Sequence, residues 1–233
     1  MSLDFKILDL GNISYQDAWK IQQEFFEKRQ IGEVPDTLIF AQHPPTITLG
    51  SNKEWNTIKV PESEIRKRGI ELYNSKRGGG AAYLGPGQIV GYTIMDIHPY
   101  GGVLNFMKML EEVMIKTSKN FGIDVDRYDV MNPTTDKPYR ATWYRNNGND
   151  HVLCTKGIGM RLKGNGSYTH HGFCLNVNKN QSYFDLIDPC GFPVEEVKPI
   201  SMEEINGEVI NYLDVKNKIV ENFKEVFGKN GEA

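Results

Sequence analysis

A glycine-rich run from residue 77 to residue 88 constrains this chain more than any other feature of its sequence. The run reads Arg-Gly-Gly-Gly-Ala-Ala-Tyr-Leu-Gly-Pro-Gly-Gln, and strand-like sequence flanks it on both sides. Because glycine has no Cβ, such a run permits tight turns, close approach of a ligand and exposure of amide N–H groups. Arg77 adds a rigid set of donors that suits a carbonyl or a phosphate. An ordinary hairpin is the alternative, but the second corner at Gly85-Pro86-Gly87 favours a ligand-binding loop.

The composition is that of a globular protein. With 233 residues, 39% hydrophobic and 24% charged, the chain suits one large domain, residues 1–233, or two small ones, and it can bury a substantial core. A net charge of −3 and the lack of a dense basic stripe argue against a nucleic-acid partner. The apolar stretches are too short to cross a bilayer, so no membrane is expected. Three cysteines, an odd number, favour a reducing compartment, and we expect a cytoplasmic protein.

The apolar periodicity predicts an α+β domain with a mixed sheet. Strands outnumber helices and do not alternate with them one for one, which argues against a doubly wound sheet. Ser14 is expected to cap the first helix, and Gly228 to end the last one. Helices are predicted over 14–29, 103–121, from 201 onward and over 215–227. Strands are predicted over 37–41, 46–49, 70–73, 89–95, 139–143, 151–162 and 173–177.

Cys190 is a candidate nucleophile. It lies between two prolines and beside a glycine in Pro189-Cys190-Gly191-Phe192-Pro193, a rigid segment that is expected to be accessible. A small residue that merely fits this corner is the alternative. The thiolate is the nucleophile, and a free thiol with a pKa of about 8.5 is only slightly ionised at neutral pH. One ammonium in a partly dry site can supply the ~1.5 units of pKa lowering that activation needs.

A candidate ammonium lies in the predicted strand 151–162. Alternation places Lys156 on one face with Val152, Cys154, Ile158, Met160 and Leu162. A buried lysine is costly unless it is paired or deprotonated, so this position suggests a functional amine. A β-bulge at Gly157 that turns Lys156 outward is the alternative.

Metal and nucleotide sites find little support in the sequence. His170, His171 and the three cysteines lack the spacing of recognisable zinc sites, so we expect no metal. The glycines do not fit the phosphate-binding patterns G-x-x-x-x-G-K-[ST] or G-x-G-x-x-G, and no G-x-S-x-G is present. We therefore expect no cofactor.

Four segments together resemble the lipoyl(octanoyl) transferases, the lipoate-protein ligase B family. They are residues 43–50 (HPPTITLG), residues 77–92 with the glycine-rich run, residues 171–177 (HGFCLNV) and the tripeptide 189–191 (PCG). In order and spacing they cover about residues 37 to 193, and the combination is specific. The resemblance implies an α+β domain of the biotin/lipoate protein ligase type, with a mixed β-sheet flanked by helices.

The resemblance also implies an activity and a set of site residues. The family moves an octanoyl group from octanoyl-acyl carrier protein to a lysine of the lipoyl domains of 2-oxoacid dehydrogenases, or of the glycine-cleavage H protein, without ATP. A cysteine carries the acyl group as a thioester, and a lysine lowers the pKa of that cysteine. By residue match Cys190 is the nucleophile, and Lys156 is the expected catalytic lysine. The matching acyl-binding residues are Arg77, Gly78, Gly79, Gly80, Ala81, Ala82, Tyr83, Leu84, Gly157, Ile158, Gly159, His171, Gly172, Phe173 and Cys174.

The chain departs from the family pattern at three positions. Leu84 stands where the family usually has histidine, and Cys174 replaces an alanine. The family lysine, counted back from Gly159 without a gap, falls on Cys154, two residues before Lys156. Two alternatives to a transferase stay open: an ATP-dependent lipoate ligase, and a non-catalytic protein that binds acyl chains or lipoyl domains.

Overall fold

The computed structural model describes residues 5–128, 130–132, 137–139, 141–178, 183–193 and 197–229. The side chains of residues 132, 137–139, 190 and 229 are not among those described. A mixed sheet crosses the molecule in the order β1-β2-β7-β12-β11-β10, and β14 pairs with β11. The β1–β2 and β11–β14 pairs are parallel, and the other neighbours are antiparallel. The strands of this sheet are β1 (Lys6–Asn12), β2 (Thr37–Gln42), β7 (Gln88–Ile94), β10 (Thr142–Asn146), β11 (Asn149–Lys163), β12 (Gly166–Asn176) and β14 (Lys198–Pro199).

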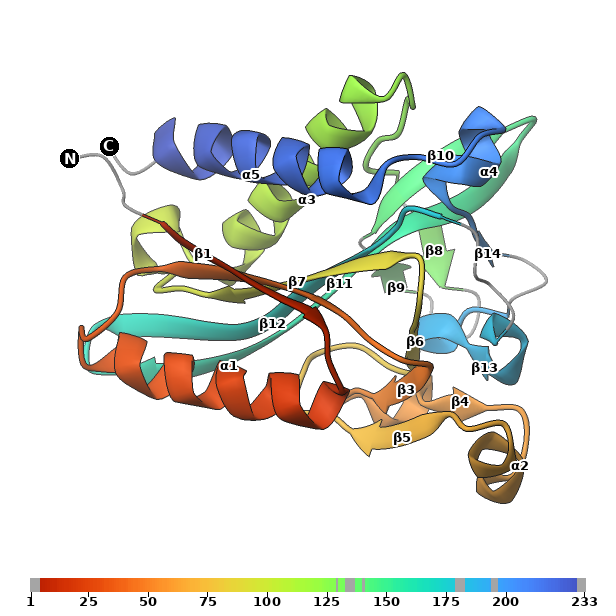
Figure 1. Ribbon diagram of the computed structural model, residues 1–233, viewed down its shortest axis with the longest axis horizontal. Coiled ribbons are helices and arrows are strands. Elements are labelled where there is room, and N and C mark those ends of the chain that lie inside the picture. Colours follow the sequence, from red (N-terminus) through yellow and green to blue (C-terminus); the bar gives the residue numbers. More distant parts are fainter. Residues whose placement is uncertain are drawn as a thin grey trace.

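Helices cover both faces of this sheet (Figure 1). Helix α1 (Tyr15–Gln30) lies on one face, and helices α3 (Val103–Asn120) and α5 (Tyr212–Lys229) pack together on the other. The fold is therefore the predicted α+β architecture. Smaller elements complete it: α2 (Glu62–Lys67), α4 (Met202–Asn206), and short 3₁₀ turns that include η1 (Lys53–Trp55), η2 (His98–Tyr100), η3 (Phe184–Leu186) and η4 (Pro189–Gly191).

A second, three-stranded sheet frames the glycine-rich run. Its order is β5 (Glu71–Asn74), β3 (Thr46–Leu49) and β6 (Ala82–Leu84). Strand β3 pairs in parallel with β5 and antiparallel with β6, so the loop at residues 75–81 joins the two outer strands. Two short ribbons, β4 (Thr57–Ile58) with β13 (Ile187–Asp188) and β8 (Val130–Asn132) with β9 (Lys137–Tyr139), lie outside both sheets.

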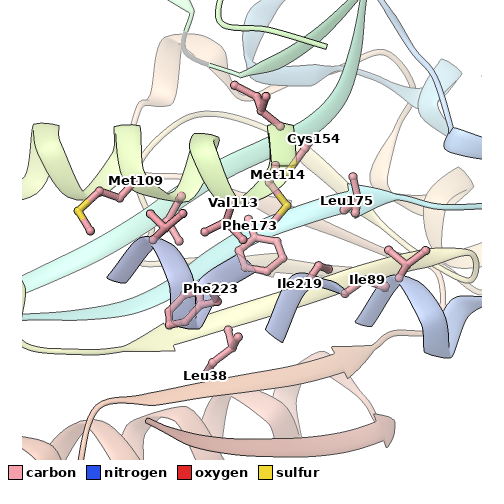
Figure 2. Close-up of a cluster of buried hydrophobic side chains, with 14 of the residues drawn as sticks. Leu38, Ile89, Met109, Val113, Met114, Cys154, Phe173, Leu175, Ile219 and Phe223 are labelled. Carbon is pink, nitrogen blue, oxygen red and sulfur yellow. The ribbon is translucent and has the colours of Figure 1, made fainter. Parts of the chain in front are cut away.

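The larger core lies between the main sheet and helices α3 and α5. Phe173 and Leu175 of β12 and Cys154 of β11 pack there against Met114 and Phe223 (Figure 2). All five side chains are buried, because these strands turn alternate residues toward the two helices. On the opposite face a smaller cluster of Ala18, Phe26, Ile39, Val90 and Ile94 joins α1 to the sheet.

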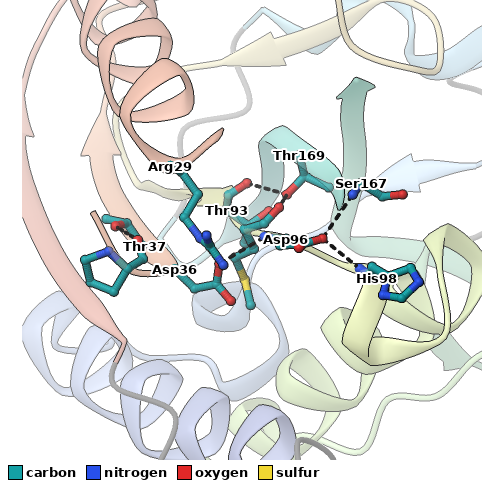
Figure 3. A network of polar contacts seen from close by, with 10 residues as sticks. Arg29, Asp36, Thr37, Thr93, Asp96, His98, Ser167 and Thr169 are labelled. Carbon is teal, nitrogen blue, oxygen red and sulfur yellow. Dashed lines mark hydrogen bonds and ion pairs between the residues drawn. The ribbon is translucent and has the colours of Figure 1, made fainter. Parts of the chain in front are cut away.

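A polar network fastens the end of the sheet that lies far from the glycine-rich loop (Figure 3). Arg29 Nε lies 2.6 Å from Asp36 Oδ1, and the same carboxylate oxygen accepts from the Asp96 amide at 2.9 Å. Asp96 Oδ1 in turn accepts from the amides of His98 and Ser167, each at 3.0 Å. These contacts tie the end of α1 to the starts of β2 and β12 and to the end of β7.

The local signals in the sequence are largely confirmed. Ser14 caps α1 by accepting from the Asp17 amide, and Ser201 forms a complete capping box with Glu204. Residues 147 and 148 both have positive φ in a hairpin turn, as Asn-Gly predicts. Three predictions differ most from the structure. β12 begins at Gly166 rather than at residue 173, and α5 runs from Tyr212 through Gly228 to Lys229. The predicted strand 139–143 falls partly in β9, which ends at Tyr139, and partly in β10, which begins at Thr142.

Candidate active site

Arg77 holds the glycine-rich loop in place. Its Nη2 donates to the carbonyl oxygen of Thr48 at 2.9 Å, to Thr48 Oγ1 at 2.8 Å and to the carbonyl oxygen of Gly80 at 2.9 Å. Its Nη1 donates to the carbonyl oxygen of Gly78 at 3.0 Å. The guanidinium thus binds carbonyls, as expected, but those of its own loop and of β3. Its substrate-binding role stays a prediction.

The loop lies directly against β11 through backbone atoms. The Gly78 amide donates to the carbonyl oxygen of Ile158 at 2.9 Å. A Cβ on Gly157 would lie 2.9 Å from the Gly78 carbonyl oxygen, and a Cβ on Gly80 would overlap the backbone of Trp55. Glycine is required here for close approach, which explains the unusual composition of the run.

A cleft opens between this loop, the main sheet and the start of α1, and its space of about 440 Å³ includes the open solvent at its mouth. The strand register arranges its floor in two rows that run across β11, β12 and β7. One row is Thr155, Cys174 and Val90, and the other is Gly157, Gly172 and Tyr92. The second row begins with two glycines, and the loop lies over the first of them, since a Cβ on Gly157 would lie 2.9 Å from the Gly78 carbonyl oxygen and 3.2 Å from Arg77 Cδ. The cleft is lined by Tyr15, Thr48, Arg77, Ala82, Leu84, Val90, Tyr92, Thr155, Lys156, Gly157, His171, Gly172, Phe173 and Cys174.

The two ends of the cleft differ in exposure. Ala82, Thr155 and Gly157 are partly exposed and form its mouth. Tyr15 is 4% exposed and Tyr92 is 2% exposed, and together with the buried Thr48 and His171 they form its inner end. The cleft therefore opens over β11 and runs toward β7 and α1.

Hydrogen bonds between side chains fix the inner end. Tyr15 Oη lies 2.9 Å from Ser75 Oγ and 2.9 Å from His171 Nε2, and Ser75 Oγ lies 3.1 Å from the same nitrogen. His43 Nδ1 lies 2.8 Å from the carbonyl oxygen of Ile13, so this nitrogen carries the proton and Nε2 accepts from the Tyr92 hydroxyl at 2.6 Å. Burial lowers the pKa of His43, which keeps its imidazole neutral.

His171 adopts a left-handed backbone conformation with φ 62°. Trp19 of α1 contacts the rings of both His170 and His171, so two consecutive residues of β12 face the same side of the sheet. Strict alternation would separate them. A non-glycine residue with a positive φ has a strained backbone, and such strain is common at ligand sites. Burial lowers the pKa of His170 to about 4 and that of His171 well below its usual value, and both imidazoles are neutral near pH 7.

The Cys190 segment lies beside a second hollow of about 470 Å³, which adjoins the mouth of the cleft. Ala82 and Thr155 line both spaces, and Pro189 and Phe192 line the second. Cys190 lies in the 3₁₀ turn η4, which contacts η1 and β6. The Cys190 side chain lies outside the described part of the structure, so its reactivity stays a prediction.

Lys156 forms a buried ion pair on the other face of the sheet. Its Nζ lies 2.8 Å from Glu111 Oε1 of α3, and its side chain has no exposed surface (0%). Glu111 Oε2 also lies 2.9 Å from Arg127 Nε. The residue as a whole is 8% exposed, so the part that lines the cleft is its main chain. Burial lowers the pKa of Lys156, and Glu111 acts in the opposite direction. The pairing of Lys156 with Cys190 stays a prediction.

The structure of strand β11 differs in three details from the face that was predicted to carry Lys156. Its register with β12 is continuous from Cys154 to Lys163, so a bulge at Gly157 that exposes Lys156 is wrong. The irregularity lies instead opposite Leu153, where Thr142 pairs with Cys154 and Trp143 with Val152. Leu153 and Cys154 consequently both enter the α3 core, whereas Val152 packs with Phe192 on the other side. Farther along, Met160 is 45% and Leu162 is 70% exposed, so the predicted apolar face is not buried there.

The two other cysteines are packed rather than accessible. Cys154 is fully buried, and burial raises the pKa of its thiol to about 12. Cys174 faces the cleft, and burial raises the pKa of its thiol well above its usual value. Leu84, which replaces the usual histidine, is 7% exposed and adds an apolar wall.

The structure brings most of the predicted acyl-binding residues to one place. Arg77, Ala82, Leu84, Gly157 and the segment 171–174 line the cleft, while Ala81 and Tyr83 line the adjoining hollow. Gly78 and Ile158 meet through their backbones, Gly79 has φ 83° within the loop, and Gly159 lies against the ring of His170. Their binding of a substrate is not tested by these contacts. Five lining residues were missed by the sequence reasoning: Tyr15, Thr48, Val90, Tyr92 and Thr155.

The described residues contain neither a metal-binding cluster nor a helix that could span a membrane. No group of three or more His, Cys, Asp or Glu side chains among them is arranged to hold a metal ion. None of the described helices combines the length and the apolar character that a membrane span requires.

Comparison with known proteins identifies the class of protein. Residues 14–224 match the lipoyl protein ligase A/B catalytic domain. The chain belongs to this family. An octanoyltransferase from Desulforamulus reducens is 35% identical over 222 residues, covering 95% of this chain and 90% of that protein. An octanoyltransferase from Alkaliphilus metalliredigens is 36% identical over 227 residues, covering 97% of this chain and 96% of that protein. With such relatives along nearly its whole length, the chain is an enzyme, an acyltransferase, as its motifs predicted.

Solved structures confirm the fold. A bipartite lipoate protein ligase from Thermoplasma acidophilum, described together with its E2 lipoyl domain, superposes with a TM-score of 0.67 at 13% identity, covering 97% of this chain and 84% of that chain. A lipoate-protein ligase A bound with ATP gives a TM-score of 0.66 at 14% identity, covering 97% of this chain and 86% of that chain. The biotin/lipoate ligase-like α+β fold is therefore established.

Proposed function

We propose that the protein transfers an octanoyl group from octanoyl-acyl carrier protein to a lysine of a lipoyl domain through a thioester on Cys190. The acceptors are lipoyl domains of 2-oxoacid dehydrogenases or the glycine-cleavage H protein. One catalytic domain, residues 1–233, carries out both half-reactions in the cytoplasm without a nucleotide or metal. The observation that carries the proposal is the similarity to octanoyltransferases along nearly the whole chain.

The cleft supports an acyl substrate. Its floor contains Gly172 and the apolar Val90, and Leu84 contributes an apolar wall. At ~0.8 kcal/mol per buried CH₂, the six methylenes of an octanoyl group supply roughly 5 kcal/mol of binding. The mouth adjoins the hollow beside Pro189, so a chain in the cleft directs its carboxyl end toward the Cys190 segment.

The proposed reaction has two steps. In the first, the Cys190 thiolate attacks the carbonyl carbon of the donor thioester; a new C–S bond forms, the bond to the carrier breaks, and the carrier thiol leaves with a proton. In the second, the neutral amine of the acceptor lysine attacks the enzyme thioester. A C–N bond forms, the bond to Cys190 breaks, and the amine proton passes to a base.

For the activating group we propose Lys156. Its support is the desolvated position on β11, next to Thr155 of the cleft. The ammonium is paired with Glu111 on the α3 side. We therefore expect it to act on Cys190 through its charge across the strand, and its influence to depend on Glu111.

The test uses the purified protein, octanoyl-acyl carrier protein and no nucleotide. Intact mass is expected to rise by one octanoyl group that maps to the peptide containing Cys190, and addition of a lipoyl domain is expected to move the group to the domain. Transfer that requires ATP would instead establish an ATP-dependent ligase. Octanoyl binding with neither a thioester nor transfer would establish a non-catalytic binding protein.

A further inference from the structure

The inner end of the cleft is walled by an aromatic ring that is held on several sides. Tyr15 is the first residue of α1 and is 4% exposed. Its ring centroid lies 5.2 Å from that of Tyr73 and 5.9 Å from that of His43, and a stacked contact with His171 lies at 6.3 Å. The ring therefore has neighbours that resist its displacement.

The hydroxyl of Tyr15 is held as firmly as its ring. It lies within 2.9 Å of both Ser75 Oγ and His171 Nε2, and these two atoms are 3.1 Å apart. His171 itself keeps a strained backbone, and its Nδ1 lies 2.7 Å from His170 Nδ1. Moving Tyr15 would therefore leave buried polar groups without their partners, which is costly.

The floor of the cleft leads directly to this wall. From the mouth at Thr155, the floor passes Cys174 and Gly172 and ends at Tyr92, whose hydroxyl donates to the buried His43. Two strand spacings, roughly 10 Å, separate β11 at the mouth from β7 at the inner end, about the length of an extended eight-carbon chain. Additional methylenes would meet Tyr15 and Tyr92 at the inner end, where both side chains are fixed by hydrogen bonds.

We propose that Tyr15, held by Ser75 and His171, closes the acyl cleft and sets the longest acyl chain that the enzyme transfers. The inference rests on the proposed function, because it assumes that an acyl chain enters over β11. It assigns chain-length selection to the start of α1, a segment outside the glycine-rich loop and the Cys190 turn. Tyr15 acts on the far end of the chain, so it selects among substrates rather than taking part in bond formation.

The experiment is a competition between two donors in one tube. Octanoyl- and dodecanoyl-acyl carrier protein are mixed in equal amounts, and the ratio of the two acyl groups on the lipoyl domain is read by mass. The ratio does not depend on the fraction of enzyme that is folded, so a destabilised variant still gives an answer. For Tyr15→Leu, which shortens the side chain but stays apolar, the share of dodecanoyl over octanoyl is expected to rise at least about tenfold.

Two matched variants separate ring size from other effects. Tyr15→Phe keeps the ring and loses the hydroxyl, so the ratio is expected to change less than about threefold. Val90→Ala enlarges the floor beside Cys174 rather than the wall that Tyr15 forms, so it is expected to weaken transfer of both chains alike. A Tyr15→Leu enzyme with the wild-type ratio would overturn the inference. Failure of the wild-type enzyme to transfer octanoyl at all would contradict the proposed function instead.

Discussion

The two faces of the central sheet treat buried polar groups in different ways. On the α3 face the core holds a buried ion pair, Lys156 with Glu111. On the α1 face, Tyr15, Tyr92 and His171 line open space, and neutral hydrogen bonds join Tyr15 to His171 and Tyr92 to His43. A single strand serves both faces: Lys156 belongs to the first, and its neighbour Thr155 to the second. The comparison shows that the position of a residue along β11 does not indicate its role unless the face to which its side chain points is also known.

The largest expected effect contrasts Cys190 with a cysteine of the α3 core. Cys190→Ser is expected to lower acyl transfer by at least roughly 10³-fold, because it removes the proposed nucleophile. Cys154→Ala is expected to retain transfer but to cost stability, because Cys154 fills the α3 core. Single-turnover kinetics with octanoyl-acyl carrier protein, together with urea unfolding, measure both. Full activity of the Cys190→Ser protein would remove the thioester mechanism.

The next effect concerns the ion pair. Glu111→Gln is expected to lower the free energy of unfolding by about 3–5 kcal/mol, since the carboxylate that neutralises the buried ammonium is lost. Lys156→Met is expected to cost less, because Arg127 continues to neutralise Glu111. Urea denaturation of the two variants checks the order, and equal losses would argue against it.

Variants of the same ion pair test whether Lys156 affects the reactivity of Cys190. If Lys156 stabilises the Cys190 thiolate, Lys156→Met raises the pH at which Cys190 is alkylated, because the nearby positive charge is lost. Lys156→Arg, which keeps the charge, is the matched control. Identical alkylation profiles for the three proteins would make the pair purely structural.

A third effect is the dependence of stability on pH, which is expected to come from histidines on the α1 face. His43, His170 and His171 all lie on the α1 face, and burial lowers the pKa of each. Below pH 6.5 the unfolded chain takes up protons that the folded protein excludes, so stability is complete above this pH and is lost as the pH falls. For His170 the loss continues to about pH 4. We expect His170→Gln to reduce the slope between pH 6 and pH 5 by about 1.4 kcal/mol per unit. An unchanged slope in urea unfolding would show that His170 is protonated in the folded state.

The sequence was sufficient for features that depend on neighbouring residues. Ser14 and Ser201 cap helices because their hydroxyls reach amides three residues on, and the Asn147-Gly148 turn follows from its own backbone preferences. The glycine-rich run was identified for the same reason. Its requirement for glycine, however, comes from the backbone of β11 and Trp55, which no local pattern shows.

The shape of the cleft depends on strand register and on the face to which each side chain points, and the sequence was insufficient to predict either. One extra residue at Leu153 moved Val152 to the opposite face from Cys154, so simple alternation grouped them wrongly. The positive φ of His171 placed two adjacent histidines on one face. Tyr15 and Thr48 join the cleft through tertiary packing. The period-two placement of Val90 and Tyr92 was the one signal that could have found part of the inner end.

The smallest effect tests the residue that lies between the two spaces of the site. Thr155 lines both the cleft and the hollow beside Pro189, and it is partly exposed. Thr155→Val keeps the shape and removes the hydroxyl, and the loss of one neutral hydrogen bond to a bound acyl group is worth about 0.5–1.5 kcal/mol. We therefore expect kcat/KM for octanoyl transfer to fall two- to tenfold, roughly, while stability changes by less than about 1 kcal/mol. Steady-state kinetics beside urea unfolding give the two numbers. A loss of stability without a loss of transfer would show that Thr155 has a structural role, like the residues of the α3 face. The proposed difference between the two faces of β11 would then be wrong at Thr155.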